Sequence, residues 1–251
     1  MDRHGRVTDV ESLRGLMKQR LTETGLWPFR KERRAVMSEL GAREAYRLWA
    51  PIYASETATS FLEEELAREL LRGLPKTRLL DAGCGIGRRI VDLPGAVGID
   101  ASPEMLAAGR ARNVVTGDVR TMPFTSNHFD MVWCRLVLGH LPDPLRAYRE
   151  FARVCAPGGY VFVTDFHPDA TAAGHQRTFT DTAGTVYRVE HHVHSNHVHL
   201  AEAAGLSLVA HRDGVVGPSI RDFYVRGIGL RAYRRDAGLK LVAAFLFRRP
   251  E

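Results

Sequence analysis

The chain has 251 residues, of which 45% are hydrophobic and 25% charged, a composition that suits one globular domain with or without small additions. Its formal net charge of +6 comes from scattered arginines, so it indicates a basic solvated surface and leaves a polyanionic partner as an alternative. The three isolated cysteines exclude a disulfide framework and a thiolate zinc site.

The termini and the apolar runs predict a cytosolic protein without a membrane anchor. Met1–Asp9 is charged and lacks the apolar core of a signal peptide. The longest apolar run, Leu241–Phe247, is far shorter than a helix that spans a bilayer.

Residues 1–58 are expected to form a helical cap in front of a core domain at 59–251. Thr8 and Glu11 have the spacing of a capping box, and the helix that they begin ends at Gly25. The spacing of apolar residues predicts three more helices, over Lys31–Leu40, Arg43–Tyr53 and Ser60–Leu71.

From residue 77 onward, short apolar runs alternate with helical stretches. The runs are Arg78–Leu80, Ala96–Ile99, Val114–Thr116, Met131–Cys134, Tyr160–Thr164, Leu206–Ala210 and Leu239–Phe247. Continuous apolar strands separated by helices are typical of a parallel sheet that is covered on both faces. We therefore expect an α/β fold, a Rossmann-like doubly wound sheet of seven mostly parallel strands, with ligand sites at the carboxyl ends of the strands.

One segment interrupts this alternation and predicts a small lid inserted at about residues 166–200. Within it, Arg177–Glu190 alternates Thr, Phe, Val and Tyr around the turn residues Asp181–Gly184, which is a hairpin signal. Because the insertion follows the fifth strand, we expect it to overhang the ligand site.

The strongest motif is Leu79–Gly87, LLDAGCGIG, a strand that leads into a glycine loop and then, we expect, a helix. Gly83 and Gly85 allow a tight turn and close approach to a ligand, and amides at a helix start favour an anionic group. The third glycine of a dinucleotide-binding loop is replaced by Arg88. Asp81 suits a neighbouring ammonium and sulfonium better than a pyrophosphate.

Acidic residues follow the next two strands. Asp100 ends the second strand and precedes Ala101 and Met105, and its carboxylate can accept hydrogen bonds from two ribose hydroxyls. Asp118, followed by Val119, ends the third strand and suits an adenine amino group. Each acid alone is often an ordinary cap at a strand end, but their order along successive strands favours one shared ligand site.

Residues from about 77 to 165 resemble the class I S-adenosylmethionine-dependent methyltransferases. The resemblance rests on the glycine loop, on Asp100 and Asp118 with the residues that follow them, and on the segments His140–Asp143 and Pro157–Gly159. It is closest to the small-molecule group that includes quinone-biosynthesis and malonyl-carrier-protein methyltransferases. It implies that the last strand of the sheet is antiparallel.

The resemblance also implies roles for individual residues. The methionine part of S-adenosylmethionine falls to Asp81, Gly83, Cys84 and Gly85, the ribose to Asp100 and Ala101, and the adenine to Met105, Asp118 and Val119. Cys134 is expected beside the reactive methyl group. Tyr53 and Tyr46 match aromatic positions that close over the cofactor, with Tyr46 assigned to the substrate side.

The sequence departs from this family pattern in three places. The helix expected between Gly87 and Pro94 is short, Arg135 stands where a small polar residue is commoner, and Gly139 replaces a larger residue before His140. The last two departures lie at the end that faces the methyl group, so they concern the identity of the substrate.

Methyl transfer is an in-line displacement in which the protein mainly aligns the reactants, and a base assists when the acceptor is a hydroxyl. The candidate bases are His140, His167 and His194, and we place His191 in the substrate site. Arg135 and Arg177 can neutralise an acidic substrate. No metal is expected, because no carboxylate or thiolate has ligand spacing from the histidines. A metal held through His192, His194 and one other histidine is one alternative for this cluster, and polar lid residues are another.

The sequence thus predicts an enzyme that methylates a small molecule, with oxygen favoured as the acceptor atom. A nucleic-acid methyltransferase is the first alternative, although the fourth strand ends in Cys134–Val137 instead of the Pro-Pro-aromatic signature of base amino methylation. A non-catalytic cofactor-binding partner protein is the second. The acceptor and the oligomeric state are left open.

Overall fold

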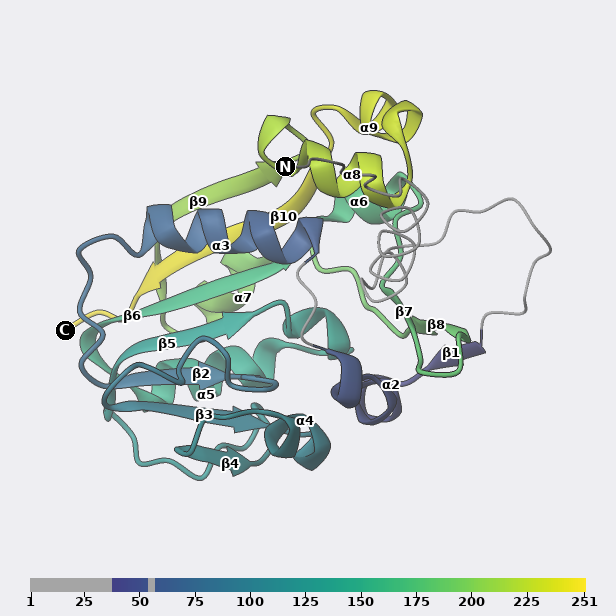
Figure 1. Cartoon of the computed structure of the whole chain (residues 1–251). Coiled ribbons are helices and arrows are strands. Elements are labelled where there is room, and N and C mark those ends of the chain that lie inside the picture. Colours follow the sequence, from purple (N-terminus) through teal and green to yellow (C-terminus); the bar gives the residue numbers. More distant parts are fainter. Residues whose placement is uncertain (1–37, 54–56) are drawn as a thin grey trace, which may run out of the picture.

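A seven-stranded sheet forms the centre of the computed structural model, which describes residues 38–53 and 57–251 (Figure 1). The strands lie in the order β4-β3-β2-β5-β6-β10-β9. Their bounds are β2 Leu79–Ala82, β3 Ala96–Asp100, β4 Val114–Thr116, β5 Phe129–Arg135, β6 Cys155–Phe166, β9 Ser207–Val215 and β10 Lys240–Arg248. All pairings are parallel except those of β10, which runs antiparallel to both β6 and β9. The predicted mostly parallel sheet with an antiparallel last strand is confirmed.

The strand order reverses between β2 and β5. From β2 the chain continues outward to β3 and β4 on one side, and then crosses to β5 and β6 on the other. In open parallel sheets, ligands bind at the carboxyl ends of the strands beside such a reversal. The site is therefore expected where β2, β3, β5 and β6 end.

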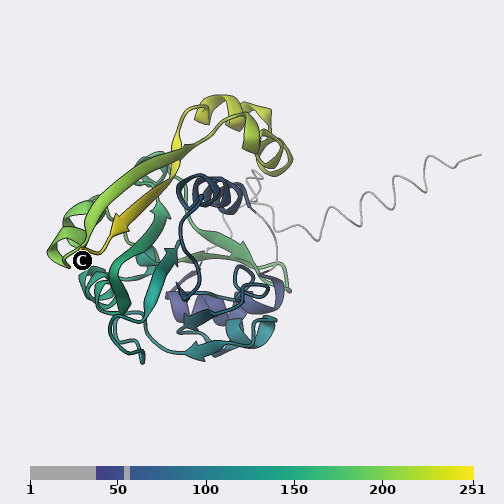
Figure 2. The same ribbon diagram turned by 90° about the vertical axis from the view of Figure 1, so that its left-hand side faces the viewer.

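Helices cover both faces of the sheet, which explains why the strands are apolar without alternation. On one face lie α5, Leu145–Val154, and α7, His197–Ala203, packed on residues such as Leu80 and Val132. On the other lie α3, Ala58–Leu70, and α8, Arg221–Gly227, packed on neighbours such as Leu79 and Met131. Figure 2 shows α3 against one face of the twisted sheet, with α8 and α9, Leu230–Asp236, above it.

Shorter elements connect these layers. They are α4 Pro103–Ala108, α6 Pro168–Ala172, and the 3-10 turns η1 Ala50–Ile52, η2 Leu138–His140 and η3 Pro218–Ile220. Ser102 caps α4, because its side chain accepts a hydrogen bond from the amide of Met105 at 3.3 Å. Thr57 and Ser60 form a reciprocal capping box that fixes the start of α3. No helix within residues 38–53 and 57–251 is long and apolar enough to cross a membrane.

A second, three-stranded sheet lies beside the carboxyl ends of the main strands (Figure 1). It contains β7, Thr178–Thr180, and β8, Val186–Val189, which pair antiparallel around the predicted turn. The third member is β1, Ser38–Leu40, parallel to β8. The predicted hairpin is therefore present.

The predicted helix Lys31–Leu40 is wrong over its described end, because Ser38–Leu40 is a strand. The free edge of β8 supplies the reason: the amide of Glu190 donates to the carbonyl of Leu40 at 2.8 Å, and Arg188 pairs with Glu39. Tertiary pairing thus overrides the local helical spacing. The helix predicted over Thr8–Gly25 lies outside the described residues. The helices predicted over Arg43–Tyr53 and Ser60–Leu71 are present as α2, Ala42–Trp49, with η1, and as α3.

The helix expected after the glycine loop is absent. Residues 83–95 form successive turns, in which the amides of Gly87, Ile90 and Leu93 each donate to the carbonyl three residues earlier. Gly87 and Gly95 have φ of +67° and +78°, which interrupts a helix at both ends of the segment. The proposed attraction of an anionic group by a helix start at this loop is therefore also wrong.

Candidate active site

The glycine loop after β2 is tied to the end of β3. The amides of Gly83 and Cys84 both donate to the carbonyl of Ile99, at 2.7 and 3.0 Å. Gly83 has φ of +79°, and a Cβ there would lie 2.3 Å from a methyl carbon of Val137. Only glycine fits this position, where the loop packs against the segment that follows β5.

Asp100 at the end of β3 organises the same loop. One carboxylate oxygen accepts from the amide of Gly85 at 2.8 Å, and the other accepts from the amide of Ser102 at 2.8 Å. Burial raises the pKa of Asp100, and these amides oppose the shift. Because the side chain keeps some exposure, it can also accept hydrogen bonds from a ligand beside the loop. Ala101, the next residue, is exposed.

Asp81 is fully buried in β2 and has no hydrogen bond from any residue of the described chain to either carboxylate oxygen. Burial raises its pKa, while the charges of Arg89 and Arg135 act in the opposite direction. A buried carboxylate without a partner is costly, so it favours a cationic or hydrogen-bond-donating ligand.

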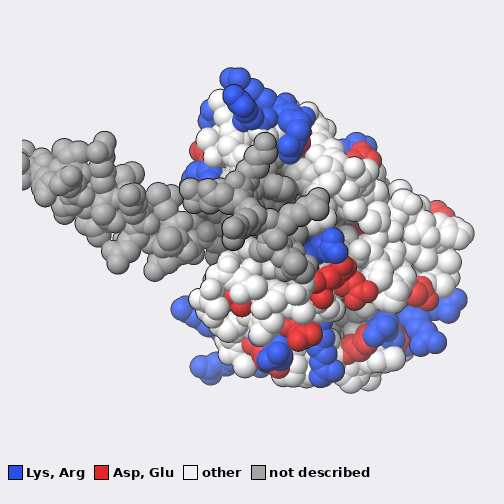
Figure 3. All heavy atoms as spheres, turned by 90° about the vertical axis from the view of Figure 1, so that its right-hand side faces the viewer, with Lys and Arg blue, Asp and Glu red and all other residues white. Residues whose placement is uncertain are grey.

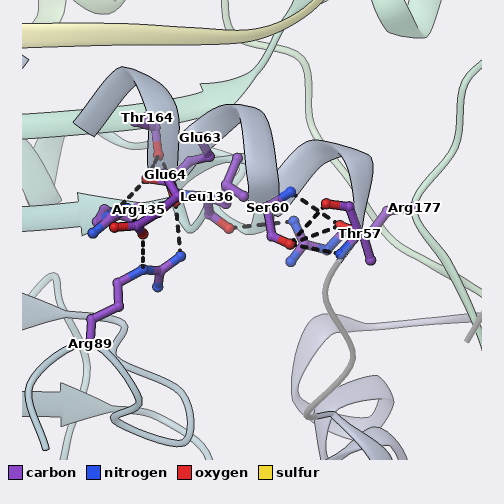
Figure 4. A network of polar contacts seen from close by, with 9 residues as sticks. All are labelled: Thr57, Ser60, Glu63, Glu64, Arg89, Arg135, Leu136, Thr164 and Arg177. Atoms are coloured by element: carbon purple, nitrogen blue, oxygen red, sulfur yellow. Dashed lines mark hydrogen bonds and ion pairs between the residues drawn. The ribbon is translucent and has the colours of Figure 1, made fainter. Parts of the chain in front are cut away.

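A charged network lies between α3 and the end of β5 (Figure 4). The guanidinium of Arg135 binds Glu63 and Glu64, with Nη2 at 2.8 and 2.7 Å from their carboxylates. Arg89 donates to Glu63 at 3.0 Å, and the Thr164 hydroxyl donates to it at 3.2 Å. Although burial alone raises it, Arg135 and Arg89 hold the pKa of Glu63 below its ordinary value.

Apolar and aromatic side chains line the side of the loop where Met105 lies. Met105 and Val119 are buried, at 1% and 6% exposure. A Cβ on Gly85 would lie 3.1 Å from the terminal methyl of Met105 and 4.0 Å from the ring of Tyr53. Asp118 stands nearer the surface and holds Arg120 at 2.6 Å, which lowers the pKa of its carboxyl group.

A second cluster, which we call the imidazole cluster, consists of Tyr46, His140, Arg177 and His191. The Tyr46 hydroxyl lies 3.0 Å from Nε2 of His140 and accepts a hydrogen bond from Arg177 at 2.6 Å. Nδ1 of His140 lies 3.3 Å from the carbonyl of Glu190, and the rings of His140 and His191 are 5.9 Å apart edge to face. Burial lowers the pKa of His140 to about 3 and that of His191 to about 4, so both imidazoles are neutral at physiological pH.

Arg177 reaches this cluster from the start of the hairpin. Its Nη1 lies 3.5 Å from the carbonyl of Leu136, a residue held at φ of +60° directly after β5 (Figure 4). No carboxylate pairs with Arg177 within residues 38–53 and 57–251, and its Nε has no hydrogen-bond partner there. The guanidinium can therefore accept an anionic group of a ligand.

The two clusters adjoin. Tyr46 stacks on Trp49 at 5.8 Å and meets Tyr53 edge to face at 5.8 Å, so α2 and η1 link the imidazole cluster to the glycine loop. Burial raises the pKa of Tyr46; Arg177 opposes this shift, and Tyr53 and Asp100 add to it. The dependence on Asp100 shows that Tyr46 lies within electrostatic range of the glycine-loop site.

Comparison with known proteins identifies the domain. Residues 80–163 match the family described as "Methyltransferase domain". The demethylmenaquinone methyltransferase of Mycolicibacterium vanbaalenii is 39% identical over 105 residues, which cover 39% of this chain and 46% of the relative. The malonyl-acyl-carrier-protein O-methyltransferase of Herminiimonas arsenicoxydans is 38% identical over 114 residues, covering 41% and 44%. Residues 80–163 are therefore a methyltransferase domain, and this part of the chain is similar to class I S-adenosylmethionine-dependent methyltransferases.

The structural comparison agrees with this family in fold. A putative methyltransferase solved in complex with the Trm112 activator of Haloferax volcanii superposes with a TM-score of 0.60 at 19% identity, over 83% of this chain and 97% of that one. The chain spans less than half of the length of the two curated relatives. S-adenosylmethionine is the cofactor of the family, and the unpartnered carboxylate of Asp81 beside Asp100 fits a cationic nucleoside.

Several residues that the sequence assigned to the methyltransferase site have other partners in the structure. Arg135 is buried against Glu63 and Glu64, so its charge is already paired within the protein. Cys134 is 0% exposed inside the apolar core, and burial raises its pKa well above the ordinary thiol value. Cys84 is buried in the loop itself, at 4% exposure.

Two of the three candidate bases have their hydrogen bonds outside the imidazole cluster. His167 caps α6, accepting from the amide of Asp169 at 3.1 Å, and its Nε2 lies 3.8 Å from Asp213 on β9. His194 lies 2.9 Å through Nε2 from the carbonyl of Leu141. His140 is the candidate base that joins Tyr46, Arg177 and His191. Within the described ranges, no group of histidine, cysteine, aspartate and glutamate has the arrangement of a metal site.

Sequence reasoning missed two acids of this methyltransferase, Glu63 and Asp165. Glu63 follows the apolar stripe of α3 beside Leu62 and Leu66, and a charge there was a signal that a buried cation lies opposite. Asp165 is the penultimate residue of the apolar β6, whereas Asp100 is the last residue of β3, so both acids lie at the carboxyl end of a buried strand.

Proposed function

We propose that this protein transfers the methyl group of S-adenosylmethionine to an oxygen atom of a small, acidic molecule. The observation that carries the proposal is the unpartnered carboxylate of Asp81 beside a glycine loop tied to Asp100, with the imidazole cluster directly adjoining. The cofactor, when bound, supplies an activated methyl group, so the protein has mainly to hold the acceptor in line with it.

We call Asp81, Gly83, Gly85, Asp100 and Met105 the cradle. Each part of the nucleoside would contact different side chains in and beside it. Asp81 would accept hydrogen bonds from the ammonium group and Asp100 from the ribose hydroxyls, and Met105 and Val119 supply apolar contact for the adenine. The carboxylate of Asp118 already accepts hydrogen bonds from Arg120, so it can accept one from a ligand only through its remaining lone pairs. Tyr53 borders the loop at Gly85 and would cover the cofactor on the side of α2.

The acceptor would lie in the imidazole cluster. Arg177 has no acidic partner within the described ranges and would orient an anionic group, while Tyr46 and His140 hold each other by a 3.0 Å contact. The imidazoles are neutral, so each ring has a nitrogen lone pair of the kind that accepts a hydroxyl proton. One relative is named as an O-methyltransferase of malonyl-acyl-carrier protein, which supports an oxygen acceptor, whereas the name of the demethylmenaquinone methyltransferase gives no acceptor atom.

The test has two stages. Calorimetry with S-adenosylmethionine and with S-adenosylhomocysteine is expected to detect one site, and the double variant Asp100→Ala, Gly85→Val is expected to lose it. Release of S-adenosylhomocysteine is then measured with a panel of phenols, catechols, hydroquinones and dicarboxylates. Absence of heat with both nucleosides, or retained tight binding in the double variant, would contradict the proposal.

A nucleic-acid acceptor is the second candidate, because basic residues gather on one end of the molecule. Figure 3 shows Lys and Arg side chains over α8 and α9, where Arg226, Arg231 and Arg234 lie in the sequence. A phosphate backbone would be recognised by such a surface, and its binding would weaken steeply with salt. Filter binding of RNA between 50 and 200 mM salt decides this, since retention without salt dependence excludes a backbone contact.

A further inference from the structure

Gly139 and His191 fit each other across the end of the sheet. Gly139 lies in η2, and a Cβ on it would lie 2.1 Å from Nε2 of His191 and 2.7 Å from Cε1. The backbone of the same segment is joined to it, because the amide of His192 donates to the carbonyl of Gly139 at 2.7 Å. The imidazole of His191 therefore occupies the space that a larger residue at position 139 would fill, which explains this departure from the family pattern.

The carboxylate of Asp165 lies on the inner side of His191. It stands near the end of β6 with 2% exposure, one oxygen 3.8 Å from Nε2 of His191 and the other 3.4 Å from Nε2 of His197. Nδ1 of His197 in turn lies 2.9 Å from the hydroxyl of the buried Tyr148. Although burial alone raises it, the two imidazoles hold the pKa of Asp165 below its ordinary value, so the carboxylate is charged.

The two imidazoles of the cluster differ in whether a ring nitrogen is free to accept a proton. Both ring nitrogens of His140 have partners, Tyr46 at Nε2 and the carbonyl of Glu190 at Nδ1. A charged Asp165 favours a proton on Nε2 of His191, which leaves a lone pair on Nδ1. No residue within 38–53 and 57–251 hydrogen-bonds that Nδ1, and the side chain keeps 12% exposure. His191 is thus the imidazole of this cluster that has a nitrogen available for a proton.

We propose that Asp165 is the positioning residue of a His191 base, and that Gly139 provides the space in which this pair assembles. The inference rests on the methyl-transfer function proposed above and replaces His140 by His191 as the proton acceptor. Nδ1 of His191 takes the hydroxyl proton while the acceptor oxygen forms its bond to the methyl carbon, and the carbon–sulfur electron pair stays on sulfur. The imidazolium that results faces the charge of Asp165.

The position of the His191 proton tests the pair without any acceptor. Nitrogen-15 spectra of the histidine rings at neutral pH are recorded for the wild type, Asp165→Asn and Gly139→Ala, with the His191 signals identified by their loss in His191→Gln. We expect the Nε2–H form in the wild type and a changed tautomer population in both variants. His192→Gln is the control, because that ring faces Glu190 and should leave the His191 signals unchanged.

Gly139→Ala is the sharper of the two changes, because it removes no polar group and Gly139 does not have a positive φ. Its effect should depend wholly on His191. With a phenol or hydroquinone that turns over in the panel, Gly139→Ala and His191→Gln are each expected to lower kcat/KM by about 10²–10⁴-fold, and the double variant should lose no more than either one. The affinity for S-adenosylhomocysteine should change less than about twofold, since the cradle residues are untouched.

The outcomes separate this inference from the function on which it rests. An Nδ1–H tautomer of His191 in the wild type, or additive losses in the double variant, would overturn the Asp165–His191 pair. Failure of the wild type to bind S-adenosylhomocysteine would overturn the methyl-transfer proposal instead. If no acceptor in the panel turns over, the tautomer spectra alone decide.

Discussion

The proposed cofactor side and the proposed acceptor side of this molecule are built in different ways. The cofactor side lies at the ends of β2 and β3, where Asp81, Gly83, Gly85 and Asp100 fall within 20 residues of sequence. The acceptor side gathers Tyr46 from α2, His140 from η2, Asp165 from β6 and His191 from the segment after β8. The first is a local motif, and the second exists only after the chain has folded.

Because of this difference, we expect substitutions on one side to alter cofactor affinity and substitutions on the other to alter the reaction with the acceptor. A glycine loop and a strand-end carboxylate are fixed by the backbone of neighbouring strands, so their effects should fall on cofactor affinity. The imidazole cluster depends on the lid and on α2, so its members should act on the acceptor and on proton transfer.

Replacing Arg135 by Met should lower the free energy of unfolding by at most about 3–5 kcal/mol, because the buried Glu63 would keep only Arg89 as a charged partner. Glu63 has a depressed pKa in the folded protein, so the stability that it contributes is present above its ordinary pKa and disappears as the pH falls through the depressed value. The loss in Arg135→Met should accordingly shrink in acid. Urea unfolding at several pH values measures both effects.

Arg212→Met is the matched control for that variant. Arg212 pairs with Glu69 at 3.0 Å, but both side chains are more than half exposed, at 55% and 56%. Exposed pairs contribute about 0–1 kcal/mol, so this change should be small at every pH. Equal losses in the two arginine variants would show that burial of the Arg135–Glu63 pair does not determine the effect.

Replacing Asp100 by Ala should weaken binding of S-adenosylhomocysteine about 100-fold. The variant loses two charge-assisted hydrogen bonds to the loop, to the amides of Gly85 and Ser102, as well as the ribose acceptor. Calorimetry gives the affinity, and Asp118→Ala is the comparison because its carboxylate is already paired with Arg120. A larger loss in Asp118→Ala would reverse the assignment of the two acids.

Replacing Asp81 by Asn should weaken the same binding about tenfold and yet stabilise the ligand-free protein by about 1–2 kcal/mol. Asp81 has a raised pKa, so its charge lowers stability at pH above that value, and this penalty disappears as the pH falls through it. The gain should therefore be present at neutral pH and absent in acid. Thermal unfolding against pH checks the sign, and a variant less stable than the wild type at neutral pH would show that Asp81 already has a partner.

Replacing Tyr46 by Phe should have the smallest effect on the cofactor. The change removes the hydroxyl that joins His140 to Arg177 but keeps the ring on Trp49. We expect affinity for S-adenosylhomocysteine within about twofold of the wild type and a raised KM for the acceptor, because a single neutral hydrogen bond contributes about 1 kcal/mol. A loss of cofactor affinity as large as that of Asp100→Ala would mean that the two sides are not separate.

Much of the fold could be predicted because its signals are local. All seven core strands and the hairpin at 178–189 lie where apolar runs and turn residues place them. The exceptions are Ser38–Leu40, which pairs with a strand nearly 150 residues away, and the loop 83–95, where glycines replace a short helix by turns. In both, a contact or a backbone angle outweighs the spacing of side chains.

The cofactor cradle could be named from the sequence for the same local reason, and the partners of buried charges could not. In the sequence, Arg135 is an arginine at the end of a strand with no acidic neighbour. Its partner Glu63 lies on α3 and contacts it only in the folded chain. Gly139 was visible as a departure from the pattern, but its reason, the ring of His191, lies 52 residues further along the chain.

By itself the sequence determined the parallel sheet, the glycine loop and the acids at the ends of β2 and β3, because each depends on neighbours within a strand and its turn. The tertiary structure alone decided which charges remain unpaired and which imidazole keeps a nitrogen available. Pairing and burial act through space, and a low-dielectric interior makes the nearest charge decisive wherever it lies in the chain.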